Sequence, residues 1–202
     1  MAKTKNPELE QRRKAQITDT VVRLLVEGSH RSLTLDRVAR EAGVSKGMVT
    51  YYFDSKDQLI VAAIERFLEE QQRALHTIVR EPRPAAERLH RLIEVALPDR
   101  EILEVQVQLQ LEVLSFAKTN PEAADQVRRS YVQFRETCEE MIAVGIDEGY
   151  VTVADSRWIY LVLHALVDGM AMQLALDRSL DVTEARRRIF ELVESLLGAA
   201  GS

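Results

Sequence analysis

The 202-residue chain has one cysteine, five prolines, eight glycines and few aromatic residues. The lone Cys138 excludes an internal disulfide and a cysteine-based zinc site. So few glycines and prolines leave too few turns for a many-stranded sandwich or barrel. Cys138 stands at helical spacing with Tyr131, Phe134 and Met141, which favours a packed core thiol over a redox group. The N-terminal residues contain no apolar run, so we expect no signal peptide and a cytoplasmic protein.

Charge is distributed unevenly along the chain. The formal net charge is −5. Residues 1–58 hold 11 Lys/Arg and 8 Asp/Glu, a charge of +3, whereas residues 59–202 hold 16 and 24, a charge of −8. A basic N-terminal part on an acidic body is expected of a protein that presents one end to DNA. Lys3 and Lys5 could belong to an arm that follows DNA or to a solvated tail.

Hydrophobic spacing predicts an all-α fold. Apolar residues recur at helical intervals, and caps or helix-breaking residues separate the runs. The predicted helices cover about 7–26, 34–42, 45–53, 56–80, the segment ending at Pro98, the segment around 105–116, 121–149, 156–177 and 184–197. We expect a three-helix domain over residues 1–58 and a six-helix domain over residues 59–202.

Residues 105–113 alternate between apolar and polar side chains, which by itself predicts a half-buried strand. The chain offers no partner strand, and a lone strand leaves its backbone groups unpaired. As a helix, the same segment has one apolar face with Val105, Leu109 and Val113 and another with Val107 and Leu111. We therefore predict a helix that is buried on two sides.

Residues 158–176 form an apolar run of nearly membrane length. Asp168 stands in its middle, where a carboxylate is costly in lipid. We expect no membrane insertion. A helix that is apolar all round can instead pack its own core on one side and a partner subunit on the other.

The segment 33–59 has the pattern of a helix-turn-helix. Thr34 is a good N-cap for a first short helix, and Gly43 stands where the chain must turn sharply. Ser45 then caps a second helix that ends near Phe53. In this motif the second helix lies in the major groove of DNA.

Two lysines stand at helix starts. Lys46 is the first residue of the second helix, and Lys56 follows the cap Ser55 of the next helix. A cation at a helix N-terminus is unfavourable by about 0.3–1 kcal/mol unless an anion binds there. A DNA phosphate would be that anion, although two solvated surface lysines would give the same pattern.

The stretch GVSKGMVTYYFDSKDQL, residues 43–59, resembles the N-terminal signature of the TetR family of bacterial transcriptional regulators. Many members carry a tyrosine that contacts DNA at the position of Thr50, so that contact is lost here or moves to Tyr51. The BetI-like branch is similar in having a small hydroxyl residue there. The expected DNA-binding residues are Thr34, Ser45, Lys46, Gly47, Met48, Thr50, Tyr51, Tyr52 and Lys56.

From Tyr160 onward the chain is similar to the C-terminal domain of BetI-like members. The resemblance implies a homodimer through the last two helices, a palindromic operator, and a small molecule that enters a pocket and releases the DNA. The expected dimer residues are Leu163, Val167, Met170, Ile189, Val193 and Leu196.

The expected ligand pocket is apolar with a few polar groups. Its proposed lining is Phe67, Gln106, Gln110, Phe116, Tyr131, Phe134, Trp158 and Asp168, and the resemblance suggests a small cationic or amphipathic effector, to which Glu112 could also contribute charge. Gln106 and Gln110 could instead bond each other, and His164 with Asp168 could form an interfacial pair rather than a ligand dyad. All eight could also be ordinary core.

No catalytic constellation, phosphate-binding glycine loop or zinc spacing stands out in the chain. We therefore expect no cofactor, no metal and no enzymatic activity. A helical-bundle enzyme, or an interaction module that does not bind DNA, is the alternative. The expected partners are double-stranded operator DNA, a small-molecule effector and a second copy of the chain.

Overall fold

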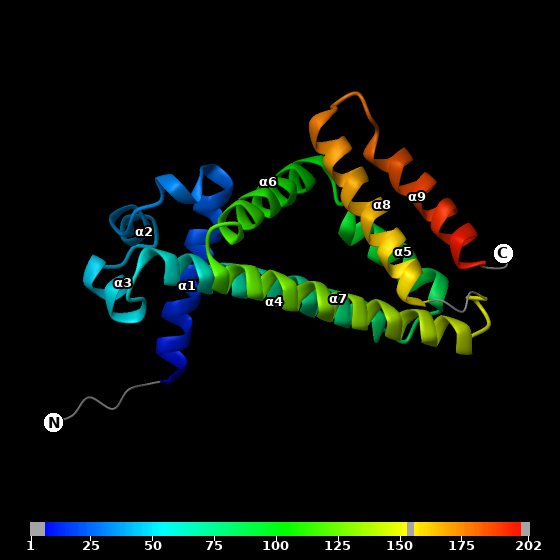
Figure 1. The fold of residues 1–202 in the computed structure, drawn as a ribbon, viewed down its shortest axis with the longest axis horizontal. Helices are drawn as coiled ribbons and strands as arrows, with labels where there is room; N and C mark the ends of the chain where they lie inside the picture. The colour runs from blue at the N-terminus through cyan, green and yellow to red at the C-terminus, as the bar shows by residue number, and fades with distance from the viewer. Residues whose placement is uncertain (1–6, 153–155, 199–202) are drawn as a thin grey trace. The chain divides into compact units, whose positions relative to one another are not determined.

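The computed structural model describes residues 7–152 and 156–198 (Figure 1). Lys3 and Lys5 lie outside this part. The described residues form nine α-helices and one short 3-10 helix, without a strand. The elements are α1 (Pro7–Glu27), η1 (His30–Ser32), α2 (Leu35–Glu41), α3 (Lys46–Tyr52), α4 (Lys56–Val79), α5 (Ala85–Ala96), α6 (Arg100–Ala117), α7 (Pro121–Asp147), α8 (Ser156–Leu176) and α9 (Val182–Leu197). The all-α prediction is confirmed.

Helix α6 resolves the ambiguous segment in favour of a helix. Leu103, Val107, Leu109 and Val113 are all buried, on two sides of α6. The segment is therefore a helix buried on two sides, as predicted. The prediction is wrong for Val105 and Leu111, which are 46% and 44% exposed because the two buried sides do not extend to their positions on the helix.

The chain forms two compact units. One unit contains the described residues up to Glu69 together with Gln108–Arg128; the other contains Glu70–Val107 together with the described residues from Arg129 onward. Helices α4, α6 and α7 each contribute to both units, whereas the predicted division falls at residue 58. That division remains a prediction.

The first unit is built around α1, α2 and α3, which lie close together in Figure 1. Apolar residues of α1 meet residues from the short helices and from the first half of α4. The buried set includes Ile17, Val21, Leu24, Leu25, Val38, Ala39, Val49, Phe53, Leu59, Ile60 and Ile64, with Leu109, Val113 and Phe116 added from α6. This core fixes the orientation of α2 and α3.

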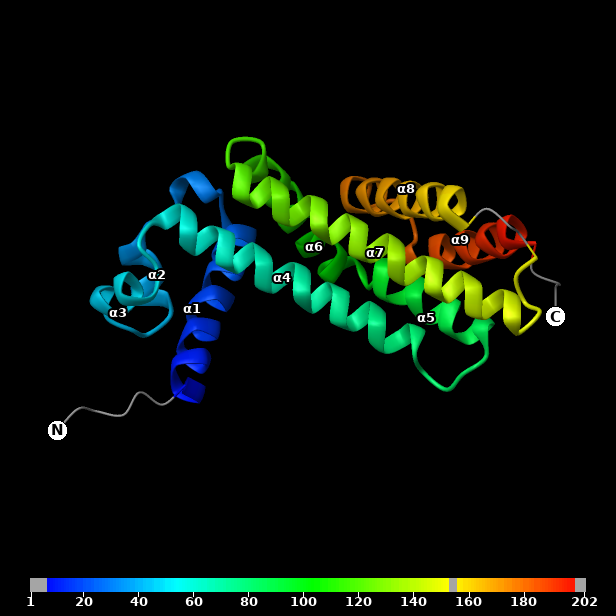
Figure 2. The same cartoon turned by 60° about the horizontal axis from the view of Figure 1, so that its bottom comes forward.

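The second unit packs α5, α8 and α9 together, and α8 and α9 run side by side in both views (Figures 1 and 2). Its core contains Leu97, Leu103, Ile142, Leu174, Ile189 and Leu197, all nearly inaccessible to solvent. Two arginines tie its elements together. Arg100 donates to the carbonyls of Leu174 and Leu180, and Arg186 donates to the carbonyl of Leu97.

Helix α8 exposes an apolar stripe. It is long and apolar enough to cross a membrane by length and composition, and only 11% of that stretch is buried inside the chain. Trp158, Leu161 and Leu176 are 64%, 47% and 76% exposed, and Ala165 and Gly169 are exposed as well. At 100° per residue these five positions share one face of the helix. One chain alone therefore leaves this face uncovered.

Candidate functional site

The two helices of the helix-turn-helix begin and end as the sequence predicts. The Thr34 hydroxyl accepts from the Arg37 N–H at 3.2 Å, and the Ser45 hydroxyl accepts from the Met48 N–H at 3.1 Å. Gly43 has φ +64°, a left-handed conformation that costs glycine little, and it permits the turn. The Val44 N–H donates to the Ala39 carbonyl at 3.0 Å, which closes the corner. The motif is therefore fixed by local capping and a single glycine.

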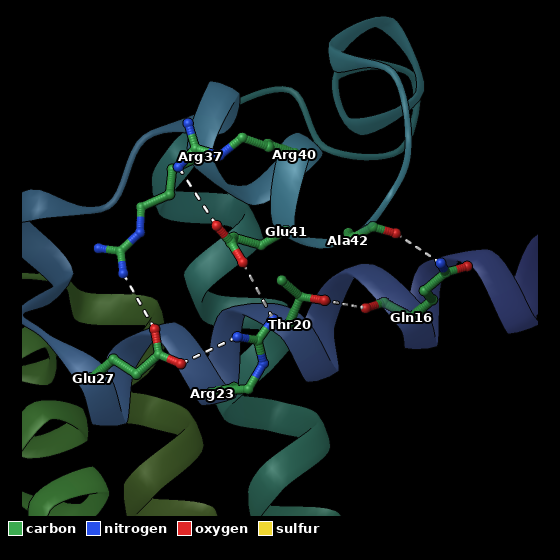
Figure 3. A network of polar contacts seen from close by, with 8 residues as sticks. All are labelled: Gln16, Thr20, Arg23, Glu27, Arg37, Arg40, Glu41 and Ala42. Carbon is green, nitrogen blue, oxygen red and sulfur yellow. Dashed lines mark hydrogen bonds and ion pairs between the residues drawn. The ribbon is translucent and has the colours of Figure 1, made fainter.

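Helix α1 holds α2 by polar contacts (Figure 3). The Gln16 amide donates to the Ala42 carbonyl at 2.7 Å, at the C-terminal end of α2. Arg37 of α2 donates to Glu27 of α1 at 3.2 Å, and Glu27 also pairs with Arg23 at 3.1 Å. The ion pairs are largely exposed, and each contributes little stability. Together with the buried core they restrict how α2 sits on α1.

The residues expected to contact DNA are mainly exposed. Thr34, Ser45, Lys46, Gly47, Thr50 and Tyr51 are exposed, whereas Met48, Tyr52 and Lys56 are half-buried. Tyr51 is 59% exposed, and its ring packs edge-on against Tyr52 with centroids 5.0 Å apart. Tyr52 packs against the core, and the Lys14 ammonium lies 5.9 Å from its ring centroid. Tyr51 is thus the aromatic side chain of α3 that is available to a base or sugar.

Both helix-start lysines have partners within the chain. Lys46 donates to Asp36 at 2.9 Å in an exposed pair. Lys56 donates to the carbonyls of His30 and Arg31 at 3.1 and 3.3 Å. The cap of α4 is formed by Ser55, whose hydroxyl accepts from the Gln58 N–H at 3.1 Å. An ammonium has three N–H donors, so Lys56 can still meet a phosphate.

The residues expected to line the ligand pocket divide between the two units. Phe67, Gln110 and Phe116 belong to the first unit; Gln106, Tyr131, Phe134, Trp158 and Asp168 belong to the second. Phe116 is a core residue of the first unit at 4% exposure, and Trp158 lies on the exposed stripe of α8. Glu112, expected to add charge to the pocket, is instead bonded to His30.

Tyr131, Asp168 and His164 meet in the second unit, together with Tyr160. The His164 ring stacks on Tyr160 with centroids 5.3 Å apart and meets Tyr131 edge-on at 5.2 Å. Asp168 Oδ2 lies 4.0 Å from His164 Nδ1. We name these four residues the aromatic–Asp168 cluster. Tyr160 was not among the predicted site residues, although it precedes His164 by four residues and Asp168 by eight, and so shares their helix face.

The Tyr160 hydroxyl is a donor in this cluster. It donates to the Tyr131 carbonyl at 3.4 Å. Burial, followed by the nearby groups of Cys138, Tyr131 and Asp168, raises the pKa of the Tyr160 phenol to about 12. Burial also raises the pKa of the neighbouring Cys138 thiol to about 12, so the thiol is protonated at neutral pH, as a packed cysteine would be.

A polar groove lies between α4 and α7 in the second unit. It has a volume of about 290 Å³ and is lined by Gln72, His76, Gln133, Glu136, Thr137 and Glu140. The Gln72 amide donates to the Thr137 hydroxyl at 2.7 Å. Gln72 Oε1 and His76 Nδ1 are buried without a hydrogen-bond partner in the described structure. None of the eight residues expected to line the ligand pocket lies in this groove.

The expected dimer residues are mostly turned inward. Ile189 and Val193 are 2% exposed in the core of the second unit, and Leu163, Val167 and Met170 are half-buried against it. Leu196 is 39% exposed and Leu192, one turn earlier, is 45% exposed. The face free for a partner is therefore rotated from the predicted one, toward Leu161 and Gly169 on α8 and Leu192 on α9.

An all-α chain with a capped helix-turn-helix at one end and a separate helical unit has the architecture of a one-component DNA-binding regulator. Residues 17–63 match the family described as bacterial regulatory proteins, tetR family. Residues 85–198 match the family described as BetI-type transcriptional repressor, C-terminal. The chain belongs to the TetR family of bacterial transcriptional regulators, with a C-terminal domain of the BetI type.

Individual relatives are similar over most of their length. The nicotine-responsive transcriptional repressor HdnoR of Paenarthrobacter nicotinovorans is 25% identical over 83% of this chain and 86% of its own. The regulator BetI of Rhizobium meliloti (strain 1021) is 27% identical over 82% and 78%. A transcriptional regulator of Saccharomonospora viridis, solved in complex with choline, superimposes with a TM-score of 0.78 at 25% identity, over 90% of this chain and 95% of that one. The prediction of a ligand-responsive, DNA-binding regulator rather than an enzyme is confirmed.

Proposed function

We propose that the protein is a cytoplasmic homodimeric repressor that binds a palindromic operator and releases it when a small organic cation binds the C-terminal domain. The exposed start of α3, with Tyr51 at its surface, carries the DNA-binding part of this proposal. The expected contacts are Thr34, Ser45, Lys46, Gly47, Met48, Thr50, Tyr51, Tyr52 and Lys56. Thr34 and Ser45 cap their helices, and a helix N-terminus is a favourable place for a phosphate, which supports their inclusion.

The homodimer is supported by the uncovered apolar stripe of α8. Leu161, Gly169 and Leu192 are exposed in one chain, and a Cβ placed at Gly169 meets no atom within 4 Å. Small residues allow two helices to approach closely, and apolar patches of this kind mark interfaces. Two-fold symmetry of the dimer would be matched by the symmetry of the operator.

Lys56→Ala should weaken binding to all DNA sequences alike, because a phosphate contact carries no base information. The slope of log affinity against log salt should fall by about 1. Fluorescence anisotropy with operator and random duplexes over a salt series measures both quantities. Lys118→Ala, an exposed lysine just after α6, is the matched control and should leave the slope unchanged. A loss confined to the operator would instead make Lys56 a base-reading residue.

The effector is proposed to be a small organic cation at the aromatic–Asp168 cluster. Aromatic faces attract cations by about 0.5–2 kcal/mol each, and a carboxylate adds charge. Tyr131 is 41% exposed, and the Asp168 side chain is 40% exposed, so a ligand can reach both. The names of the relatives support this class, since nicotine and choline both carry a cationic nitrogen.

Asp168→Asn should reduce the response to a cation about 10-fold, because one ion pair is lost while the side-chain shape is kept. Release of labelled operator by choline or nicotine measures the response, and thermal melting measures stability. Asp147→Asn, an exposed carboxylate at the end of α7, is the control. A response that survives Asp168→Asn but is lost in Gln72→Leu would place the effector in the polar groove. Failure of both cations at millimolar concentration would contradict the proposed ligand class.

The proposal as a whole is tested by a gel shift with the DNA upstream of the protein's own gene. A retarded complex that survives excess random DNA is expected, and protection of the DNA should show two related half-sites. Absence of any sequence-specific complex, together with random-DNA binding that does not depend on salt, would contradict the DNA-binding function.

A further inference from the structure

His30 is bonded from two sides by residues of two different helices. It is 8% exposed in the short η1 helix that joins α1 to α2. Its backbone N–H donates to Glu112 Oε2 at 3.0 Å, and its ring Nδ1 lies 2.9 Å from the same oxygen. Because a carboxylate only accepts, Nδ1 carries a hydrogen in this arrangement. The ring also packs edge-on against Phe116, with centroids 5.4 Å apart. Thus α6 fixes both the backbone and the ring of His30.

The other side of His30 faces the start of α4. The His30 carbonyl accepts from Lys56 Nζ at 3.1 Å, and the next carbonyl, of Arg31, accepts from the same atom at 3.3 Å. A lysine side chain that is free in solution loses rotamer entropy when it is fixed. Here two carbonyls already restrict the ammonium before any DNA is present.

The charges of Glu112 and Lys56 reinforce each other across the His30 backbone. Burial alone would raise the pKa of Glu112, but the hydrogen bonds from the His30 N–H and ring and from Ser29 lower it below its usual range. Glu112 is therefore ionised at neutral pH. Its negative charge lies on the N–H side of His30, and the Lys56 ammonium lies on the carbonyl side. Hydrogen bonds to charged partners are stronger in a partly buried setting. Glu112 at the N–H side and Lys56 at the carbonyl side therefore both orient the η1 backbone.

We propose that Glu112 and His30 are positioning residues for DNA binding, which hold the His30 and Arg31 carbonyls so that these place the Lys56 ammonium at the DNA phosphate. This inference rests on the proposed phosphate contact of Lys56. Neither Glu112 nor His30 touches DNA in this scheme. Two of the three ammonium hydrogens serve the carbonyls, and the third serves the phosphate.

The direction in which Glu112→Gln changes the DNA affinity distinguishes the positioning of Lys56 from a general effect of net charge. Removing a negative charge from a DNA-binding protein ordinarily strengthens its attraction to DNA. Glu112→Gln removes such a charge, yet it should weaken binding to a random-sequence duplex by about 3- to 10-fold, because a neutral amide oxygen accepts from the His30 N–H and ring more weakly than the carboxylate and holds the η1 backbone less firmly. Glu122→Gln, an exposed glutamate in the first turn of α7 and in the same unit, is the matched control. It should leave binding unchanged or slightly stronger.

A double-mutant cycle that combines Glu112→Gln with Lys56→Ala tests whether Glu112 acts on DNA binding through Lys56. Glu112→Gln should have no further effect on DNA affinity in the Lys56→Ala background, and both single variants should lower the salt slope by about the same amount. His30 supplies the second variant. His30→Ala should also weaken binding, whereas His30→Gln, whose amide can donate to Glu112, should restore it. Thermal melting of each variant confirms that it is folded under the conditions of the binding assay.

Three results would overturn the inference. The first is random-DNA binding by Glu112→Gln that equals or exceeds that of the control. The second is full additivity of Glu112→Gln and Lys56→Ala, which would mean that a general loss of stability explains the effect. The third is a Lys56→Ala variant with unchanged affinity and salt slope, which would remove the phosphate contact of the proposed function as well. The first two leave that contact standing.

Discussion

The substitution Leu161→Glu on the exposed stripe of α8 is expected to convert the dimer into monomers and to lower operator affinity by roughly 100-fold or more. Leu161 is 47% exposed in the single chain, so the new carboxylate does not disturb the core of its own protomer. In a symmetric dimer the substitution would appear on both subunits. Two carboxylates would then be buried in an apolar contact without partners, which is strongly unfavourable.

Sedimentation at micromolar concentration measures the change in assembly, and anisotropy with the operator measures the change in affinity. The large loss of affinity is expected because a dimer binds its second half-site as an intramolecular event, and a monomer does not. Ala74→Glu is the matched control, since it places the same charge at an exposed position of α4, another helix of the same unit. A Leu161→Glu protein that remains dimeric would show that α8 pairs through another face.

Tyr51→Ala is expected to reduce operator affinity by about 10- to 100-fold, which corresponds to roughly 1–3 kcal/mol, while random-DNA binding stays nearly constant. Tyr51 is 59% exposed, and its truncation removes an edge-on contact with Tyr52 rather than a core residue. The loss of affinity should be confined to operator DNA. This distinguishes Tyr51 from Lys56, whose removal should weaken binding to every DNA sequence.

Tyr51→Phe separates the roles of the ring and the hydroxyl. If the ring packs against a base or sugar, Phe should keep most of the operator affinity. If the hydroxyl donates to a base edge, Phe should behave like Ala. Melting temperatures of both variants should stay close to that of the parent protein. Operator affinity that is unchanged in Tyr51→Ala would remove Tyr51 from the reading surface and leave Met48 and Thr50 as the candidates on α3.

Much of the DNA-binding end could be predicted from sequence because its signals are local. The caps Thr34 and Ser45 and the turn at Gly43 each act within four residues of themselves, and the structure shows each in the predicted role. Helix α6 was also predictable, although only through the argument that a lone strand has no partner. These features depend on backbone hydrogen bonding and on the spacing of apolar residues, which the sequence displays directly.

The contacts that join distant segments were decided by the tertiary structure alone. Glu112 was expected near a ligand and is bonded to His30, which lies 82 residues earlier. The predicted pocket residues fell into two units, and Tyr160 joined Tyr131 and Asp168 without having been predicted. For helices α8 and α9, the spacing predicted apolar faces, but not which of the apolar residues pack against the core of their own chain.

There is a physical reason why the sequence does not show which side of α8 faces the core. The α8 helix is apolar on nearly every side, so its sequence contains no polar face to show which way it is turned. Only the packing of Leu174 and Ile189 into the core reveals that Leu161, Gly169 and Leu192 point outward. The sequence by itself therefore determined the family, the helices and the DNA-reading motif. The direction of each apolar face, and the partners of each buried charge, depend on the free energy of packing segments that are far apart in the chain.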